Sequence, residues 1–308
     1  MIIIIAKHAA WGAADNFYRA FKSQGYPSVL LCLKDDKYNR TGQEKIVTKL
    51  DKTNINFWLN KCKEKDNALF ICSPTTIQSL IKKFGKEVIC NYFSNIRKKI
   101  IFITGTEYLR NYKKWNIFLY KYNFHYKFAE AEMVSLSSSN IFLCHPMEYL
   151  IPEKENIITI SHAPGLVERP EKKGTPIILS TIDKLKCKFD FNYEHIVGVD
   201  FKECLYRKGK SHIFIDQINP SVGGIGKNGY EGLALGCVTL SSVNSFKKLK
   251  EIDCIPPVIN VNTEDDLFNE LFKLLSDQKL LKEKLKESRV WDKNNYKNTV
   301  KKILEIIK

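Results

Sequence analysis

A cluster of glycines followed by a glutamate gives the clearest chemical signal in this chain. The segment runs SHIFIDQINPSVGGIGKNGYEGLALGCVTL over residues 211–240. An apolar strand pattern leads into the glycines, and a helix pattern that contains Glu231 follows them. N–H groups at a helix N-terminus bind anions, and glycine lets a ligand approach the backbone. Because a carboxylate on that helix accepts hydrogen bonds from hydroxyls, we expect a nucleotide-sugar, which carries a diphosphate and many hydroxyls. Alternatively, the glycines serve only the tight packing of a strand–helix turn and bind no ligand.

The residues after the glycine loop make the pattern more specific. They read Glu231-Gly232-Leu233-Ala234-Leu235-Gly236-Cys237-Val238, the end of a short helix, a glycine stop and a buried strand. This order resembles the donor site of GT-B glycosyltransferases of group 1, the family 4-like enzymes that include lipopolysaccharide-type sugar transferases. The family motif has a further glutamate where this chain has Gly223. The resemblance implies that the donor is held by Gly223, Gly224, Gly226 and Glu231, with loop N–H groups replacing the missing side chain.

The same resemblance assigns a second part of the donor site to residues 162–175. Family members that look like this chain carry His-x-Pro and then Lys-Gly-Thr there, as in His162-Ala163-Pro164 and Lys173-Gly174-Thr175. It implies that Lys173 contacts the donor diphosphate next to Gly174, and that Arg169 is a second cation. Two fixed cations stabilise the charge that develops on a leaving diphosphate. The alternative is that both are ordinary loop cations before a helix.

An aspartate and a glutamine stand at the end of the strand that precedes the glycine loop. We expect Asp216 and Gln217 to hydrogen-bond the backbone of that loop, a structural role. No Asp-x-Asp motif stands at a strand end to hold a metal–diphosphate complex. The resemblance therefore implies a metal-independent enzyme without a cofactor, in which a helix dipole and basic side chains hold the donor.

The first loop of the chain holds the candidates for the catalytic base. His8, Gly12 and Asp15 follow the first strand pattern, and in GT-B enzymes that loop faces the acceptor cleft. The pKa of a histidine is near neutrality, so His8 could act as the base, with Asp15 as the carboxylate candidate. Alternatively, His8 makes a polar contact and Asp15 is the N-cap of a helix over Phe17–Gln24. Glu130 and Glu132 form another possible carboxylate pair.

Strand-like and helix-like runs alternate along the whole chain, which predicts parallel sheets covered by helices. Expected strands include Ile2–Ala6, Ser28–Leu33, Ala68–Cys72, Lys99–Ile103, Ile141–Cys144, Ile157–Ile160, His195–Val199, Ile213–Ile215 and Val258–Val261. The predicted fold is α/β, with two Rossmann-like doubly wound domains over residues 1–150 and 151–308. The first is expected to bind the acceptor and the second the nucleotide-sugar. The resemblance implies that the domains face a cleft and that a helix at the C-terminus returns to the N-terminal domain.

Composition favours a packed globular protein with an anionic partner. Of 308 residues, 44% are hydrophobic and 27% are charged, and no apolar run is long enough for a membrane span. The nine cysteines have no zinc-site spacing, and Met1–Ala6 reads as a strand rather than a signal peptide, so we expect reduced thiols and a cytoplasmic location. Residues 1–150 hold 23 Lys and Arg against 12 Asp and Glu (net +11), whereas residues 151–308 hold 26 against 22 (net +4). A basic N-terminal half suits an anionic acceptor, a membrane surface or DNA.

The sequence therefore predicts a hexosyltransferase-type glycosyltransferase, peripheral on the inner face of a membrane. It would use a UDP- or GDP-sugar and build a cell-surface glycan or a lipid-linked precursor. Two alternatives stay open. One is a glucosyltransferase acting on modified DNA bases, which the charge also suits. The other is a sugar-nucleotide-binding protein of the same fold that lacks catalysis, which Gly223 suggests because the family has a glutamate there.

Overall fold

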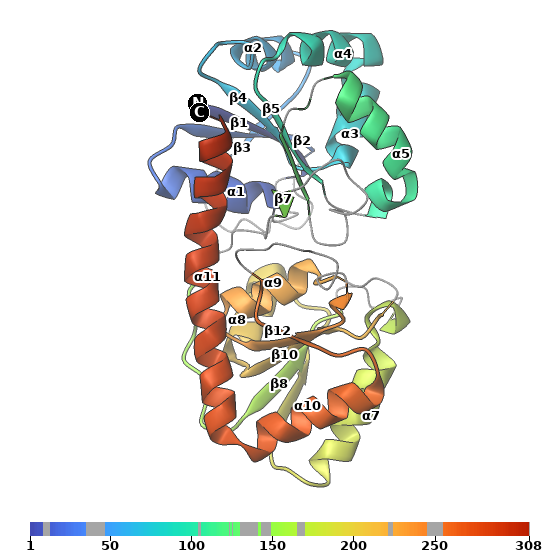
Figure 1. The fold of residues 1–308 in the computed structure, drawn as a ribbon, viewed down its shortest axis with the longest axis vertical. Coiled ribbons are helices and arrows are strands. Elements are labelled where there is room, and N and C mark those ends of the chain that lie inside the picture. The colour runs from blue at the N-terminus through green and yellow to red at the C-terminus, as the bar shows by residue number, and fades with distance from the viewer. Residues whose placement is uncertain are drawn as a thin grey trace. The chain divides into compact units, whose positions relative to one another are not determined.

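A computed structural model describes most of the chain, namely residues 1–8, 13–34, 47–103, 106–122, 124, 126–129, 141–142, 149–164, 170–220, 224–244 and 255–307. The chain divides into two compact units, Met1–Pro146 together with Lys297–Lys308, and Met147–Tyr296. Each unit is a parallel sheet covered by helices (Figure 1). This confirms the predicted α/β class, and the return of the C-terminal residues to the first unit is the return that the resemblance implies.

Unit 1 contains a seven-stranded parallel sheet in the order β3-β2-β1-β4-β5-β6-β7. Its strands are β1 (Ile2–His8), β2 (Ser28–Lys34), β3 (Val47–Lys49), β4 (Ala68–Ile71), β5 (Lys99–Ile103), β6 (Tyr126–Ala129) and β7 (Ile141–Phe142). Its helices are α1 (Ala13–Ser23), α2 (Ile55–Lys61), α3 (Pro74–Phe84), α4 (Lys86–Asn95) and α5 (Thr106–Lys121). Helices α2 to α5 share one apolar core with the sheet. On α1, Phe17 packs against Phe70 and Phe102, so the strands are buried on both faces and read as continuous apolar runs.

Unit 2 contains a five-stranded parallel sheet in the order β12-β11-β10-β8-β9. Its strands are β8 (Thr159–His162), β9 (Asn192–His195), β10 (Ile213–Gln217), β11 (Val238–Ser241) and β12 (Val258–Asn260). Its helical segments are η2 (Pro170–Lys173), α7 (Thr175–Lys186), α8 (Phe201–Lys210), α9 (Lys227–Ala234), α10 (Glu264–Ser276) and the first part of α11 (Gln278–Ile307). Helices α7 and α10 contribute to one core, and Cys204 and Leu205 of α8 pack in another with Phe214.

The strand order creates a switch point in the middle of the unit 2 sheet. The chain moves from β8 outward to β9 and then returns to β10 on the other side of β8. The loops at the carboxyl ends of β8 and β10 therefore diverge, and ligands of open α/β sheets bind in the crevice this leaves. The glycine loop follows β10, so the fold places it at this crevice.

Three sequence expectations need correction. The strand predicted at His195–Val199 lies earlier, as β9 at Asn192–His195, because an edge strand does not need continuous apolar residues. The sequence pattern predicts separate helices over Lys279–Ser288 and Asn294–Ile307, but the two are one continuous helix, α11. Helix α1 begins at Ala13, so Asp15 lies in its first turn rather than at the N-cap and pairs with Arg19 at 2.8 Å.

Candidate functional site

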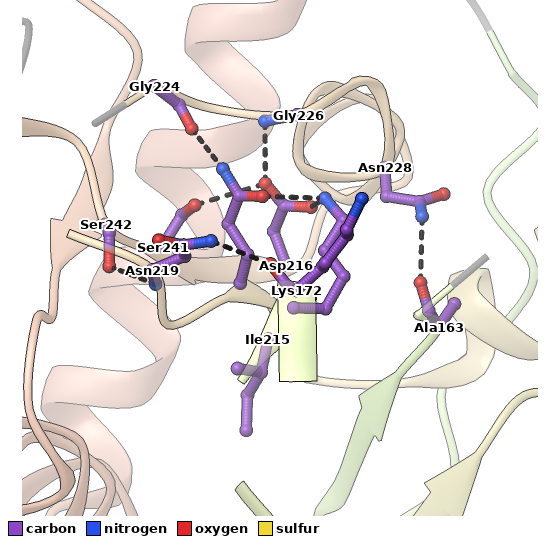
Figure 2. A network of polar contacts seen from close by, with 12 residues as sticks. Ala163, Lys172, Ile215, Asp216, Asn219, Gly224, Gly226, Asn228, Ser241 and Ser242 are labelled. Carbon is purple, nitrogen blue, oxygen red and sulfur yellow. Dashed lines mark hydrogen bonds and ion pairs between the residues drawn. The ribbon is translucent and has the colours of Figure 1, made fainter. Parts of the chain in front are cut away.

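The candidate site lies at the carboxyl end of β10, where the strand meets the N-terminus of α9. Gly226 is the N-cap of α9 and has extended backbone, and no side chain caps the helix there. The first N–H groups of a helix have no partner within it, and they carry partial positive charge. Figure 2 shows the polar network beneath this helix end, centred on Asp216. The site thus combines a helix terminus that has no side-chain cap with a buried carboxylate.

Asp216 is fully buried and ties three elements together. Its Oδ2 accepts hydrogen bonds from Gly226 N at 2.7 Å and from Ser241 Oγ at 3.1 Å. Its Oδ1 accepts one from Lys173 Nζ at 3.2 Å. The carboxylate therefore fixes the glycine loop and the end of β11 relative to each other (Figure 2). It also holds Lys173, at the end of η2, against them.

Gln217 makes a second link between the same segments. Its Oε1 accepts from Lys173 Nζ at 2.8 Å, and its Nε2 donates to Gly224 O at 2.5 Å. Asp216 and Gln217, two consecutive residues of β10, thus hydrogen-bond the glycine loop at Gly226 and at Gly224. The prediction that Asp216 and Gln217 bond the loop backbone is confirmed.

Lys173 is the cation at this edge of the sheet. Its side chain remains 21% exposed although its ammonium group bonds both Asp216 and Gln217. Gly174 follows with φ +70°, and a Cβ there would lie 2.5 Å from Ile218 O. The glycine therefore brings the Lys173 backbone against the strand end, and Ile218 N donates to Lys173 O at 3.0 Å.

Close packing favours glycine at Gly226 in the loop and at Gly229 in the first turn of α9. A Cβ on Gly226 would lie 2.9 Å from Lys173 Nζ and 3.0 Å from Asp216 Oδ1. A Cβ on Gly229 would lie 2.5 Å from Ile225 Cγ1 and 3.0 Å from Asp216 Oδ2. These glycines therefore serve tight packing around the carboxylate, and at Gly226 the same absence of a side chain keeps the backbone close to Lys173.

Glu231 lies inside the protein and is paired with two lysines. Its side chain is 2% exposed, and its Oε2 accepts from the fully buried Lys208 at 2.6 Å. Its Oε1 lies 3.4 Å from Lys227 Nζ. Burial opposes the charged form of both members of the inner pair. Their mutual attraction, together with that of Lys227 for Glu231 and of Cys204 and Asp216 for Lys208, outweighs burial, so the pKa of Glu231 is lowered and that of Lys208 is raised. Glu231 is therefore an internal carboxylate of α9, and its bond to ligand hydroxyls stays a prediction.

Asn228 connects α9 to the strand on the other side of the crevice. Its Nδ2 donates to Ala163 O at 2.8 Å, just after β8 (Figure 2). Its Oδ1 accepts from Lys208 Nζ at 3.1 Å, and this ammonium also lies 4.7 Å from the Phe214 ring. Lys208 therefore holds two side chains of α9, and through Asn228 it reaches the end of β8.

His162 is a neutral polar group at the end of β8. Because Ile215 O can only accept, His162 Nδ1 carries the proton and donates over 2.8 Å, and Nε2 accepts from Thr175 Oγ1 at 2.9 Å. Burial lowers the pKa of His162 to about 4. The imidazole therefore bridges β10 and the start of α7, which fits a structural role.

The structure brings part of the predicted donor site together. Lys173, Gly174, Gly224, Gly226 and Glu231 all lie around the end of β10 and the first turns of α9. Two predicted donor residues, Arg169 and Gly223, lie outside the described residues, as do Gly12, Glu130 and Glu132. In unit 1, His8 is the last residue of β1 and pairs in register with Lys34.

Sequence reasoning missed Lys208, Asn228 and Ser241. Neither Lys208 nor Asn228 belongs to the family pattern, and Lys208 is 23 residues from the carboxylate it binds. The one local signal is helical spacing, because Lys208 follows the apolar Cys204 and Leu205 on α8 by four and three positions.

Two lysines of the basic N-terminal half also have internal roles. Lys83 Nζ donates to Leu33 O at 3.1 Å and to Leu50 O at 2.6 Å. Lys99 is 2% exposed and donates to Ile96 O at 2.5 Å. A surface that docks an anion must therefore use other cations of unit 1, and the exposed ones include Lys82, Arg97, Lys113 and Lys114.

Metal and membrane features are not found within the described ranges. No group of three or more His, Cys, Asp or Glu side chains there could hold a metal ion. Among the same residues, no helix has both the length and the apolarity that crossing a membrane requires.

Comparison with known proteins places the fold. No protein-family model and no curated protein matches the chain. Among solved structures, a glycosyltransferase from Rickettsia africae is similar, with 13% identity, a TM-score of 0.64 and coverage of 99% of this chain and 97% of that one. HepE from Anabaena, solved with UDP and glucose, has 10% identity, a TM-score of 0.62 and coverage of 99% and 98%. An α-glucosyltransferase solved with UDP and a 13-mer DNA containing an HMU base has 13% identity, a TM-score of 0.59 and coverage of 99% and 98%. The chain therefore has the fold of the GT-B glycosyltransferases.

Proposed function

We propose that this protein is a glycosyltransferase that moves a sugar from a nucleotide-sugar bound by unit 2 to an acceptor bound by unit 1. The observation that carries the proposal is the convergence of Lys173 and the N-terminus of α9 on Asp216. A cation and a helix terminus held side by side at a switch point suit a diphosphate. The similar fold of solved glycosyltransferases over nearly the whole chain supports it.

The proposed chemistry needs charge stabilisation rather than a metal. As the glycosidic bond breaks, the leaving nucleoside diphosphate gains negative charge. Lys173 would already have exchanged Asp216 and Gln217 for a phosphate oxygen when the donor bound, and the first N–H groups of α9 would bind the diphosphate from the helix end. Because Asp216 and Gln217 hold the loop before the donor arrives, little reorganisation accompanies the reaction.

A UDP-sugar is the donor to test first. HepE was solved with UDP and with UDP-glucose, and the DNA-bound α-glucosyltransferase was solved with UDP. These complexes support a uridine nucleotide by analogy of fold. GDP-sugars form the second set.

The proposed acceptor is anionic, on a lipid-linked or cell-surface glycan precursor at the inner face of a membrane. The net charge of +11 over residues 1–150 supports an anionic acceptor. His8 and Asp15 remain the proposed candidates for the catalytic base. Since Asp15 already pairs with Arg19, it would have to leave that partner to act.

Modified DNA is the second candidate acceptor. It is favoured by the similarity to the α-glucosyltransferase that was solved with DNA, together with the basic charge of unit 1. Binding to duplex DNA would weaken steeply with salt because counterions are released. A mobility shift that persists with neutral vesicles present and disappears at high salt would place DNA before lipid.

A thermal-shift screen followed by a hydrolysis assay tests the proposal. A ligand that binds the folded state raises the melting temperature according to its affinity, so UDP- and GDP-sugars should raise it and the free sugars should not. Slow release of UDP or GDP from the stabilising sugar nucleotide should follow without any acceptor. Binding without release over long incubation would favour the non-catalytic alternative. No stabilisation by any sugar nucleotide would refute the proposed function.

A further inference from the structure

The two lysines that pair with Glu231 are held in very different ways. Lys208 is fully buried, and its Nζ lies 2.6 Å from Glu231 Oε2. Lys227 is 27% exposed, and its Nζ lies 3.4 Å from Oε1. A buried pair with a short contact is costly to break, whereas a partly exposed pair contributes little. Only the outer oxygen, Oε1, therefore has a partner that can leave easily.

Lys227 also occupies the position where an anion would bind. It is the first residue of α9, directly after the N-cap Gly226. Its ammonium lies 4.9 Å from the Phe201 ring, a weak cation–π contact that places it between α8 and the carboxylate. A lysine at the first helical position can reach an anion that binds the helix terminus, because the side chain is long and flexible.

We infer that Lys227 is a donor-binding residue that changes partner when the donor arrives. Without donor, its ammonium pairs with Glu231 Oε1. When ribose hydroxyls take that oxygen, the ammonium moves to the diphosphate at the end of α9. The inference rests on the proposed function and adds to it a residue that the family pattern does not assign.

This exchange makes the two halves of the donor depend on each other. Ribose hydroxyls must displace Lys227 to reach Oε1, and a diphosphate gives the displaced ammonium a new partner. Lys208 stays in place and keeps Glu231 charged throughout. A ligand with both groups is thus favoured over a ligand with only one.

The test compares UDP with 2′,3′-dideoxy-UDP by titration calorimetry on the full chain. The affinity ratio of the two measures what the hydroxyls contribute, with the diphosphate held constant. In Lys227→Met, the affinity for dideoxy-UDP should fall about threefold, because the diphosphate loses an ammonium that can leave Glu231 for it. The affinity ratio of UDP to dideoxy-UDP should rise by about half, because in the parent the hydroxyls must displace the part of Lys227 that is still paired with Glu231. The corresponding guanosine pair is used if the parent protein binds GDP but not UDP.

Two variants control the measurement. Lys227→Arg keeps the charge and should restore the affinity for dideoxy-UDP. Lys282→Met removes an exposed lysine on α11 and should change neither quantity. A ratio in Lys227→Met that equals or falls below that of the parent overturns the exchange. If the parent binds neither UDP nor GDP, the proposed function fails first, so the two failures are distinguishable.

Discussion

Two buried lysines, one in each unit, show how differently this fold uses an interior cation. Lys99 of β5 donates to the carbonyl of Ile96, and burial lowers its pKa. Lys208 of α8 is more deeply buried, and burial opposes its charge, yet its pKa is raised because the attractions of Glu231, Cys204 and Asp216 together outweigh burial. Lys99 bonds a neighbouring turn, whereas Lys208 holds a carboxylate that could not otherwise stay charged inside the protein.

The comparison separates a structural charge from a charge kept for chemistry. A buried ion pair is rarely more stable than apolar residues of the same volume, so stability alone does not explain why α9 carries one. The pair lies one helix turn from the anion-binding end of α9. Under the proposed function, the pair would keep the Glu231 carboxylate charged close to the hydroxyls and the diphosphate of the donor.

The largest effect should come from removing one member of the pair. Lys208→Met leaves Glu231 buried without its inner partner and should lower the free energy of unfolding by about 3–5 kcal/mol. Lys99→Met removes no counter-charge and should change it by about 1 kcal/mol or less. Urea unfolding at neutral pH measures both. The double variant Lys208→Met/Glu231→Gln should recover much of the stability that Lys208→Met loses. Equal losses of stability in Lys208→Met and Lys99→Met would contradict the distinction between the two buried lysines.

The pH dependence of stability should come from His162 rather than from the paired charges. The pKa of His162 is about 4 in the folded protein against its ordinary value of 6.5, so the unfolded chain takes up its proton first as pH falls. The contribution of His162 to stability should therefore be constant above pH 6.5 and fall by about 3 kcal/mol towards pH 4, and His212, whose pKa burial also lowers, should add to the fall. The pKa of Glu231 is lowered, so its contribution is present above 4.5 and lost only below that value. A His162→Asn variant with the same slope between pH 6.5 and 4.5 would contradict this assignment.

Lys173 should matter more for turnover than for binding. Its ammonium acts on charge that develops as the diphosphate leaves, so Lys173→Met should reduce kcat about 100-fold, the effect of losing one oxyanion donor. The affinity for free UDP should change less. Steady-state kinetics with saturating donor measures kcat, and Lys172→Met is the matched neighbour. Equal loss in both variants would mean that position 173 has no special role.

Glu231 should contribute to nucleotide affinity once its effect on stability is removed. In a Lys208→Met background, Glu231→Gln no longer leaves a buried lysine unpaired. The double variant should bind UDP more weakly than the parent by about 1–3 kcal/mol, the size of a hydrogen bond to a charged group. Titration calorimetry on the folded double variant measures this UDP affinity. Unchanged affinity would leave Glu231 as a structural carboxylate only.

The smallest effect per substituted residue is expected for the exposed cations on the surface of unit 1, which would act on membrane binding. Exposed cations attract an anionic bilayer by about 1 kcal/mol each, so charge reversal should abolish vesicle binding and leave UDP affinity intact. The variant reverses Lys82, Arg97, Lys113 and Lys114, and leaves Lys83 and Lys99 in place. Sedimentation with anionic vesicles measures binding at low and physiological salt. The matched control reverses four exposed lysines of unit 2, namely Lys186, Lys188, Lys202 and Lys282. Equal loss in both sets would mean that net charge, not this surface, drives the attraction.

The sequence by itself determined the class of fold and the location of the glycine-rich loop after β10. Apolar periodicity is a local property, so it predicted most strands, including the buried β1, β4 and β10. The glycine loop and Lys173 were also found locally, because tight turns and close backbone approach require glycine. Even the bonds from Asp216 and Gln217 to the loop follow from their position at a strand end.

The tertiary structure decided what the site residues touch. Glu231 looked like an open hydroxyl acceptor in the sequence, but packing of α8 beside α9 buries it against Lys208. Lys83 and Lys99 count towards the basic charge of residues 1–150, yet their ammonium groups bond carbonyls of neighbouring segments. Burial and pairing depend on neighbours far along the chain, so no local pattern contains them. For that reason Lys227, unremarked in the sequence, becomes a candidate ligand only when its distance to Glu231 and its exposure are known.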